Sequence, residues 1–241
     1  AGSSGAREDG PSASAEELNA AAHMAHAREQ KGVQLANTGR HLEALAEFEA
    51  AAVILKKAGG GAALQPLRAR IEAFIGNVHA LLGNLPKGLK AWIRSIKLDP
   101  SLRDARQNVI KTLTDQGRHS EALKHARTGA KVFPDEAGAH VSVGDACKNL
   151  RDFDCAKKEF AEAIRLEPTS FSAHFSLGVA HRDLMEDVPA LTLFEAAERL
   201  DPLSPAVVNA LAVVRGDTCL WGKQGEDYSD PPPGAAGEGI S

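Results

Sequence analysis

The stretch AGAHVSVGDACKNLRDFDCAKKEFAEAIRLEPT, residues 137–169, decides the fold. It contains two amphipathic segments that are separated by a break at residues 151–152. The first segment has Gly144 in its middle, and the second carries small and aromatic residues at spacings of four and three: Ala156, Phe160 and Ala163. These spacings place the three residues on one stripe of a helix, where the two small ones let another helix approach. The stretch therefore predicts a helical hairpin.

The same pattern returns every 34 residues. Prolines follow four helical runs at this period, at Pro100, Pro134, Pro168 and Pro202. The unit that ends at Pro202 repeats the glycine, alanine and phenylalanine positions, at Gly178, Ala190, Phe194 and Ala197. An earlier unit has the same internal spacing, at Gly32, Gly39, Ala44, Phe48 and Ala51. A helix-turn-helix of this length with this pattern resembles the tetratricopeptide repeat (TPR), and the resemblance covers about residues 25 to 204.

The resemblance implies an all-α fold, a right-handed α-solenoid of about five helical hairpins. The solenoid is expected to cover residues 14–216. It begins with extra N-terminal helical turns and ends with a capping helix over 205–215. The five repeat units are expected at about 25–58, 69–102, 103–136, 137–170 and 171–204. Residues 1–13 lack periodicity and are expected to be disordered. A proline-rich, acidic composition predicts a disordered or extended tail over 217–241.

One junction between units and one unit depart from the regular pattern. Gly39 and Gly83 are 44 residues apart, so ten extra residues lie between them, as a loop or as extra helical turns. In the unit from residue 103, the residues Ile110, Ala126 and Gly129 replace the expected glycine, aromatic residue and alanine. A larger residue on one helix then faces smaller ones on the other, so the volume between the helices is conserved.

The two ends of the solenoid carry their own signals. Ser14 and Glu17 form a capping-box pattern, which predicts a helix from there to about Asn37. At the other end, Gly216 is the expected stop of a helix that begins after Ser204. This last helix is apolar on nearly every side, whereas a terminal helix of a solenoid needs a polar outer face. We therefore expect the tail, with Leu220 and Trp221 as candidates, another chain, or a further domain to cover it.

Composition excludes several function classes. The net charge of −4 provides no positive field for nucleic acid or for an anionic membrane. No apolar run approaches the length that a membrane span needs. A cytoplasmic location is the default expectation, although a processed targeting signal stays open because the chain does not begin with Met.

The three cysteines, Cys147, Cys155 and Cys219, are too few for a disulfide scaffold and lack zinc spacing. Reduced thiols that pack as small apolar residues are the default prediction. The alternative is a Cys147–Cys155 disulfide that links the two helices of one unit.

No catalytic motif of a known kind is present, and histidines recur at repeat-equivalent places, such as His140 with His174. They are interpreted as half-buried packing residues. We therefore expect no enzymatic activity, no cofactor and no metal site.

In TPR proteins the first helices line a concave groove that binds a peptide or a protein segment. The resemblance places these residues on that face: Phe74, Asn77, Asn108, Lys111, Val141, Asp145, Phe175, Val179 and Arg182. The rings of Phe74 and Phe175 are candidate anchors, and the asparagines and the lysine can bind a peptide backbone. The alternative for each ring is that it packs against a neighbouring helix as core. Mixed charge along the groove disfavours RNA and DNA.

Two functions follow as hypotheses. The preferred one is a non-catalytic scaffold or adaptor that binds a partner protein segment, with possible self-association through the apolar last helix. The other is the substrate-targeting region of a larger enzyme that is similar to O-GlcNAc transferases, with the catalytic domain absent.

Overall fold

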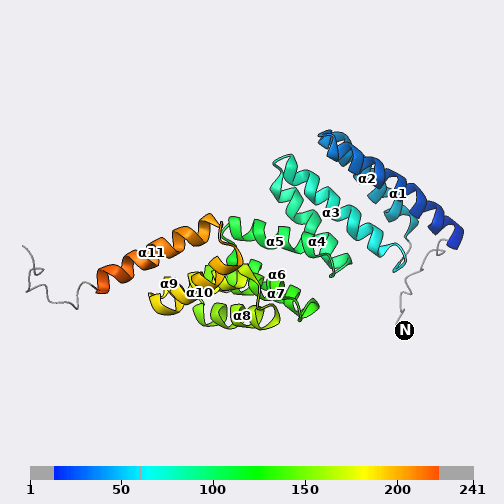
Figure 1. Ribbon diagram of the computed structural model, residues 1–241. Helices are drawn as coiled ribbons and strands as arrows, with labels where there is room; N and C mark the ends of the chain where they lie inside the picture. The colour runs from blue at the N-terminus through cyan, green and yellow to red at the C-terminus, as the bar shows by residue number, and fades with distance from the viewer. Residues whose placement is uncertain (1–13, 60, 223–241) are drawn as a thin grey trace, which may run out of the picture. The chain divides into compact units, whose positions relative to one another are not determined.

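A computed structural model describes residues 14–59 and 61–222, with side chains described as far as Gly216 (Figure 1). These residues form eleven α-helices and no strand: α1 (Ala15–Asn37), α2 (His41–Ala58), α3 (Gln65–Leu81), α4 (Leu85–Leu98), α5 (Arg103–Asp115), α6 (His119–Val132), α7 (Ala137–Asn149), α8 (Phe153–Leu166), α9 (Phe171–Asp183), α10 (Asp187–Leu200) and α11 (Pro205–Gly222). The fold is an all-α solenoid of helical hairpins, as the sequence predicts.

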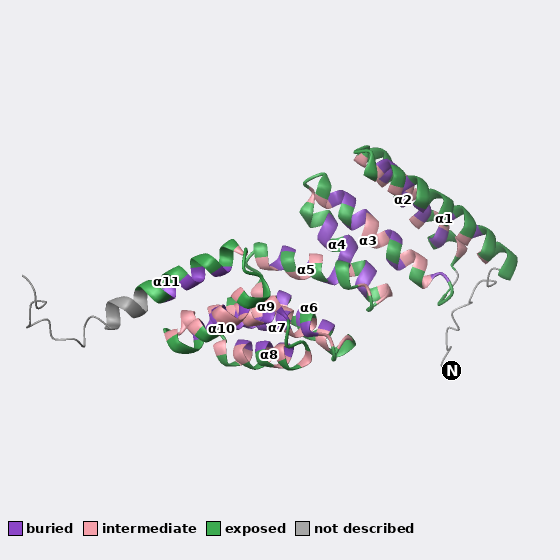
Figure 2. Cartoon of the chain, in the orientation of Figure 1, coloured by how far each residue is buried: buried purple, intermediate pink, exposed green. Residues whose placement is uncertain are grey.

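The chain divides into two compact units, Ala1–Pro134 and Asp135–Ser241. The first unit contains the hairpins α1–α2, α3–α4 and α5–α6, and the second contains α7–α8, α9–α10 and the last helix α11. In each hairpin the buried residues lie on the facing sides of the two helices and the exposed residues on the outer sides (Figure 2). The cores are therefore seams that run between neighbouring helices.

A glycine under an aromatic ring is the central contact of four hairpins. A Cβ atom added to Gly144 would lie 2.5 Å from Phe160 Cε1, and one added to Gly178 would lie 2.7 Å from Phe194 Cε1. The same contact joins Gly32 to Phe48 and Gly76 to Trp92. Each of the four rings is almost completely buried, and burying such a side chain contributes about 1.5–3 kcal/mol. The contact explains the spacing that reveals the repeat.

The third hairpin, α5–α6, fills this space differently. Ala126 is buried where the other hairpins have a ring, and Ile110 is half-buried where they have glycine. The side chain of Arg106, which is 5% exposed, lies over Gly129, and its Nη2 donates to the carbonyl oxygen of Pro100 at 2.8 Å. Burial lowers the pKa of Arg106. Volume is thus conserved, but a long basic side chain supplies part of it.

The ten extra residues of the first junction are shared among three places. The helices α2 and α3 are each four residues longer than their counterparts in the later hairpins, and the connection between them is two residues longer than the connection from α4 to α5. Most of the extra length is therefore helical turns.

The sequence predicts the start of the first helix correctly but not the end of the last one. At the start of α1, Ser14 N donates to Glu17 Oε2 at 2.8 Å and Glu17 N donates to Ser14 Oγ at 3.2 Å, which forms the predicted capping box. At the other end, the predicted stop at Gly216 is wrong, because α11 continues to Gly222. Glycine inside a helix costs only about 1 kcal/mol and does not by itself end it. Residues 1–13 and 223–241, and the side chains of Leu220 and Trp221, lie outside the described part.

The last helix buries one stripe of residues and leaves two valines exposed on its other sides. Its buried side chains are spaced by three and one: Val207, Ala210, Leu211 and Val214. They pack with Phe194 and its neighbours in a core cluster. Val208 and Val213 on other sides of the helix are 50% and 51% exposed. The exposed side of α11 is therefore mixed, with Val208 and Val213 beside the polar Asn209.

The turns inside the hairpins share one backbone conformation. A residue with positive φ follows each first helix: Gly39, Gly83, Gly117, Arg151 and Met185. Side chains with a Cβ atom disfavour this left-handed region by about 1–2 kcal/mol. In the last two hairpins a residue with a side chain adopts this conformation. In the fourth hairpin the guanidinium of that residue, Arg151, lies 4.9 Å from the centre of the Phe153 ring.

Candidate functional site

A hollow of about 340 Å³ lies on the first-helix side of the first unit. It forms where α3 passes the start of α5 and the connection that precedes it. Its lining residues are Arg70, Ala73, Phe74, Asn77, Ser101, Leu102, Arg103, Asp104 and Ala105. Two residues that the sequence predicts for the groove, Phe74 and Asn77, are among them.

The amide of Asn77 is held in one orientation at the edge of this hollow. The indole Nε1 of Trp92 donates to Asn77 Oδ1 at 2.8 Å, and Asn108 Nδ2 donates to the same oxygen at 3.2 Å. An indole N–H is a donor only, so the oxygen of Asn77 must face it. The NH₂ group of the exposed Asn77 therefore points away from the indole.

Arg70, which lines the hollow, forms an ion pair with Glu29. Arg70 Nη2 donates to Glu29 Oε2 at 2.8 Å, and a second bond joins Arg70 Nε to the other carboxylate oxygen. His26 Nδ1 also lies 2.9 Å from Glu29 Oε2. Burial raises the pKa of Glu29, which is 4% exposed, but the hydrogen bonds from Arg70 and His26 outweigh it and lower the pKa overall. The charge of Arg70 is thus largely neutralised.

The remaining predicted residues of this unit have different surroundings. The ring of Phe74 is half-buried and stacks on the Phe48 ring, with centroids 5.2 Å apart and planes 11° apart. Phe74 therefore belongs to the core and lines the hollow at the same time. Lys111 is exposed, pairs with Asp115 at 3.1 Å and lies outside the hollow lining.

In the second unit the predicted groove residues lie on α7 and α9. Val141 is 9% exposed, and Val179 is half-buried. Both charged residues have a partner on their own helix: Asp145 lies 3.4 Å from Lys148, and Arg182 lies 3.3 Å from Asp183.

The ring of Phe175 is packed between two other rings. Its centroid is 5.9 Å from that of Phe171, in a stacked arrangement, and 5.7 Å from that of Phe194 at an angle of 47°. Phe175 is half-buried at the edge of the core cluster around α11. The core alternative thus describes the packing of this ring.

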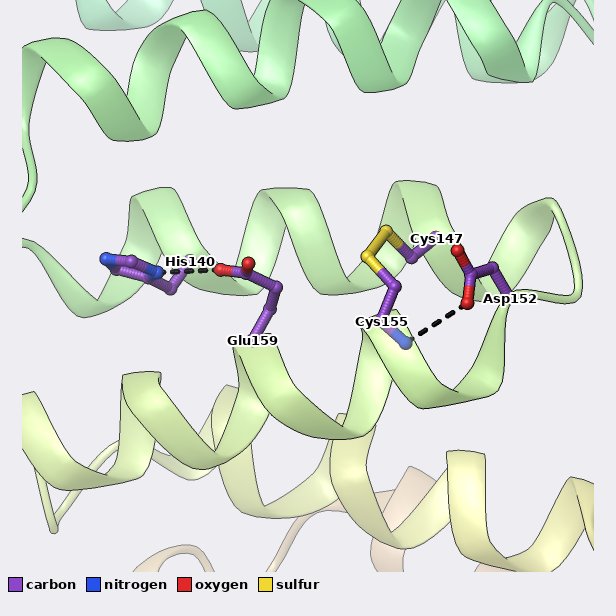
Figure 3. Close-up of a disulfide and its surroundings, with 5 residues drawn as sticks. All are labelled: His140, Cys147, Asp152, Cys155 and Glu159. Atoms are coloured by element: carbon purple, nitrogen blue, oxygen red, sulfur yellow. Dashed lines mark hydrogen bonds and ion pairs between the residues drawn. A yellow bond between two sulfur atoms is a disulfide. The ribbon is translucent and has the colours of Figure 1, made fainter.

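A disulfide joins Cys147 at the end of α7 to Cys155 in the first turn of α8, with Cα atoms 5.9 Å apart (Figure 3). The default prediction of reduced thiols is wrong for this pair, and the alternative disulfide is confirmed. A separation of eight residues with a turn between them brings the two cysteines opposite each other. In the same hairpin His140 Nδ1 lies 2.8 Å from Glu159 Oε2, and the dashed line in Figure 3 marks this contact.

The tetratricopeptide repeat family model matches residues 148–205. Its match, the glycine-ring seams and the 34-residue period all describe one repeat. The chain is a TPR protein. By sequence, no curated protein matches this TPR chain.

Solved structures with similar folds are TPR proteins as well. A TPR protein from Parabacteroides merdae aligns with a TM-score of 0.69 and 14% identity over 83% of this chain and 76% of that chain. MamA from Desulfovibrio magneticus RS-1, from residue 41 to its end, aligns with a TM-score of 0.62 and 18% identity over 76% and 97%. YrrB, described as a TPR protein with an unusual peptide-binding site, aligns with a TM-score of 0.60 and 16% identity over 76% and 89%.

These structural alignments establish the fold of the TPR chain. Proteins with this fold generally mediate protein–protein interactions. Among the helices that the structure describes, none combines the length and the apolar character that crossing a membrane requires.

Proposed function

We propose that this TPR chain is a non-catalytic scaffold that binds an extended segment of a partner protein on its first-helix face. The observation that carries the proposal is the hollow in the first unit, with the oriented amides of Asn77 and Asn108 beside it. An extended peptide needs donors and acceptors for its backbone and a hollow for a side chain. Both are present within one unit.

Preorganisation supports this proposal. The Trp92 indole fixes Asn77, and Asn77 in turn holds the amide of Asn108. A peptide that binds these groups therefore loses little affinity to the ordering of side chains. YrrB, a protein of the same fold, is described as having an unusual peptide-binding site, which supports a peptide ligand for this chain.

The charges around the hollow favour a protein ligand over a nucleic acid. Arg70 is neutralised by Glu29, and Asp104 lines the same hollow as Arg103. Phosphate groups would need cations without such acidic neighbours. A segment with small apolar and polar side chains suits this mixed surface.

The experiment is selection of binding peptides from a random display library with the full chain, followed by affinity measurement on variants. Asn108→Ala should weaken the selected peptides by about tenfold, since a good interface contact contributes about 1.4 kcal/mol. Lys111→Ala should weaken acidic peptides, whereas the same change in the exposed Lys124 of α6 is the matched control and should have no effect.

Circular dichroism of each variant should match that of the parent, because both lysines are exposed and Asn108 lies at the edge of the core. Unchanged affinity in Asn108→Ala, with a loss in Lys124→Ala, would place binding on the second helices and overturn the proposal.

A second, smaller proposal concerns the exposed side of α11. Val208 and Val213 remain half exposed, and apolar side chains gathered on a surface often mark an association site. We propose that a second copy of the chain packs on this face. Sedimentation velocity of the full chain should show a dimer whose share rises with concentration and falls in Val213→Lys. A monomer at every concentration would contradict it.

A further inference from the structure

Three side chains with metal-binding atoms meet at the turn of the fourth hairpin. Cys147 lies in the last turn of α7, Asp152 is the N-cap of α8, and Cys155 lies in the first turn of α8 (Figure 3). The two cysteine sulfurs and one carboxylate oxygen of Asp152 all lie within 4.8 Å of one another. Cys147 is buried, Cys155 is half-buried and Asp152 is exposed, so the group opens to solvent on its carboxylate side.

The backbone holds these residues together without help from the disulfide. Asp152 N donates to the carbonyl oxygen of Cys147 at 3.0 Å, and Cys155 N donates to Asp152 Oδ1 at 3.1 Å. The equivalent backbone bond closes the other four turns, which lack a disulfide: Arg40 to Leu35 at 2.9 Å, Asn84 to His79 at 2.8 Å, Arg118 to Leu113 at 2.8 Å and Glu186 to His181 at 3.0 Å. The three side chains therefore stay adjacent when the sulfur–sulfur bond is broken.

We propose that reduction of the Cys147–Cys155 disulfide creates a Zn²⁺ site formed by the two cysteine sulfurs and the carboxylate of Asp152. A dithiol reductant supplies the two electrons and two protons that convert the disulfide to two thiols, and is itself oxidised to a disulfide. Zn²⁺ then displaces both thiol protons, which pass to solvent, and binds two thiolates. The hairpin is thus linked by a disulfide when oxidised and by a metal ion when reduced.

The geometry suits zinc. Zinc–sulfur bonds are about 2.3 Å long and tetrahedral, so the two sulfurs of a bound pair lie about 3.8 Å apart. Rotation about the side-chain bonds opens the sulfurs to that distance while the Cα atoms remain 5.9 Å apart. The second carboxylate oxygen of Asp152 provides the third ligand, because Oδ1 caps the helix. Water completes four-coordination from the exposed side.

The type of ligand selects the kind of metal. Two thiolates favour soft or borderline ions such as Zn²⁺ and disfavour Mg²⁺ and Ca²⁺, which prefer oxygen. The two thiolates alone balance the charge of a divalent ion, and the carboxylate gives the complex a net negative charge. The fifth hairpin has His181, Glu186 and Pro189 at the three equivalent places, so a proline removes one ligand there. That hairpin is a natural comparison within the same unit.

The test uses the full chain with Cys219→Ser, which removes the third cysteine from the measurement. This protein is reduced under anaerobic conditions, freed of reductant and titrated with Co²⁺ and then with Zn²⁺. We expect one metal ion per chain, an absorption band of thiolate-to-cobalt charge transfer, and displacement of Co²⁺ by Zn²⁺. The oxidised form of the same protein should show none of these.

Two variants identify the ligands. Cys155→Ser should abolish the cobalt band, and its half-buried place keeps the risk to folding small. Asp152→Asn should weaken binding by about tenfold or more while it preserves the helix cap, because an amide oxygen still accepts the Cys155 N–H bond. Circular dichroism confirms that each variant is folded.

Two results would overturn the proposal. One is a reduced Cys219→Ser chain that binds Zn²⁺ no better than the Cys155→Ser variant of it. The other is equal affinity in Asp152→Asn, which would remove the carboxylate from the site.

Discussion

The third hairpin, α5–α6, and the fourth, α7–α8, have helices of equal length but different interiors. The fourth has the Gly144–Phe160 contact and a disulfide, whereas the third has Ile110, Ala126 and a buried arginine at Arg106. The two helices of the third hairpin also pack less closely against each other than those of the fourth. The comparison teaches that one backbone hairpin tolerates two ways of filling the same space, and that the ring-based one brings the helices closer together.

The largest expected effect tests the glycine seam. Gly144→Leu should destabilise the second unit by about 3 kcal/mol or more, because its Cβ atom would already lie 2.5 Å from Phe160. The matched change in the third hairpin, Ile110→Leu, conserves volume and should cost less than about 1.5 kcal/mol. Urea unfolding followed by circular dichroism measures both. Equal costs would show that the two interiors do not differ in the way described.

The second prediction concerns the disulfide. Reduction in the presence of a zinc chelator should destabilise the fourth hairpin by roughly 2–3 kcal/mol, because the Cys147–Cys155 link closes a short loop in the unfolded chain. Differential scanning calorimetry of the Cys219→Ser chain, oxidised and reduced, measures the change. The Cys155→Ser variant is the control and should not respond to the reductant.

The sequence predicts many of the contacts inside the hairpins, but only those that a local spacing of residues determines. Gly144 and Phe160 are 16 residues apart in one hairpin, so the repeat itself places one under the other. The Cys147–Cys155 bond depends on how the turn closes, which the composition does not reveal. The sequence does not predict the burial of Arg106, because arginine is usually an exposed residue. The structure shows that its side chain occupies the space that Gly129, which has no side chain, leaves open.

The candidate site shows the same division. The repeat register predicts that Phe74 and Asn77 belong to the first-helix face, and both line the hollow. It does not predict the hollow, which depends on how α3 passes the connection before α5. It leaves open whether the Phe175 ring binds a partner or packs as core, because its contact with Phe194 crosses from α9 to α10 and depends on how the two helices pack.

A third prediction uses the left-handed turn residue. Gly117→Ala in the third hairpin should cost about 1 kcal/mol, because a Cβ atom disfavours positive φ. Arg151→Gly in the fourth should stabilise by less than about 1 kcal/mol, since glycine also increases the freedom of the unfolded chain. Met185→Gly is the control without a ring contact. Thermal melting of the three variants checks the signs, and a destabilised Met185→Gly would contradict the account.

The smallest effect is a pH dependence at His125 of the third hairpin. Burial lowers the pKa of His125, and the nearby Arg106 lowers it further. The neutral imidazole is therefore favoured in the folded state, so its contribution is complete above the ordinary value of 6.5 and is lost as the pH falls through the lowered pKa. His125→Gln should flatten this part of the stability curve. At the equivalent places the fourth hairpin has His140 beside Glu159.

The ten extra residues of the first junction have a consequence for how this solenoid accepts insertions. Four residues add about 6 Å to a helix, and α2 and α3 each gain that length at the ends that meet. The added turns cover one another, with Leu55 and Leu64 buried between them. Gln65 Nε2 also donates to the carbonyl oxygen of Leu98 at 2.6 Å, which ties the lengthened α3 to the end of α4. Length changes at this junction are therefore constrained to occur in matched pairs, because a turn added to one helix alone would leave its apolar side uncovered.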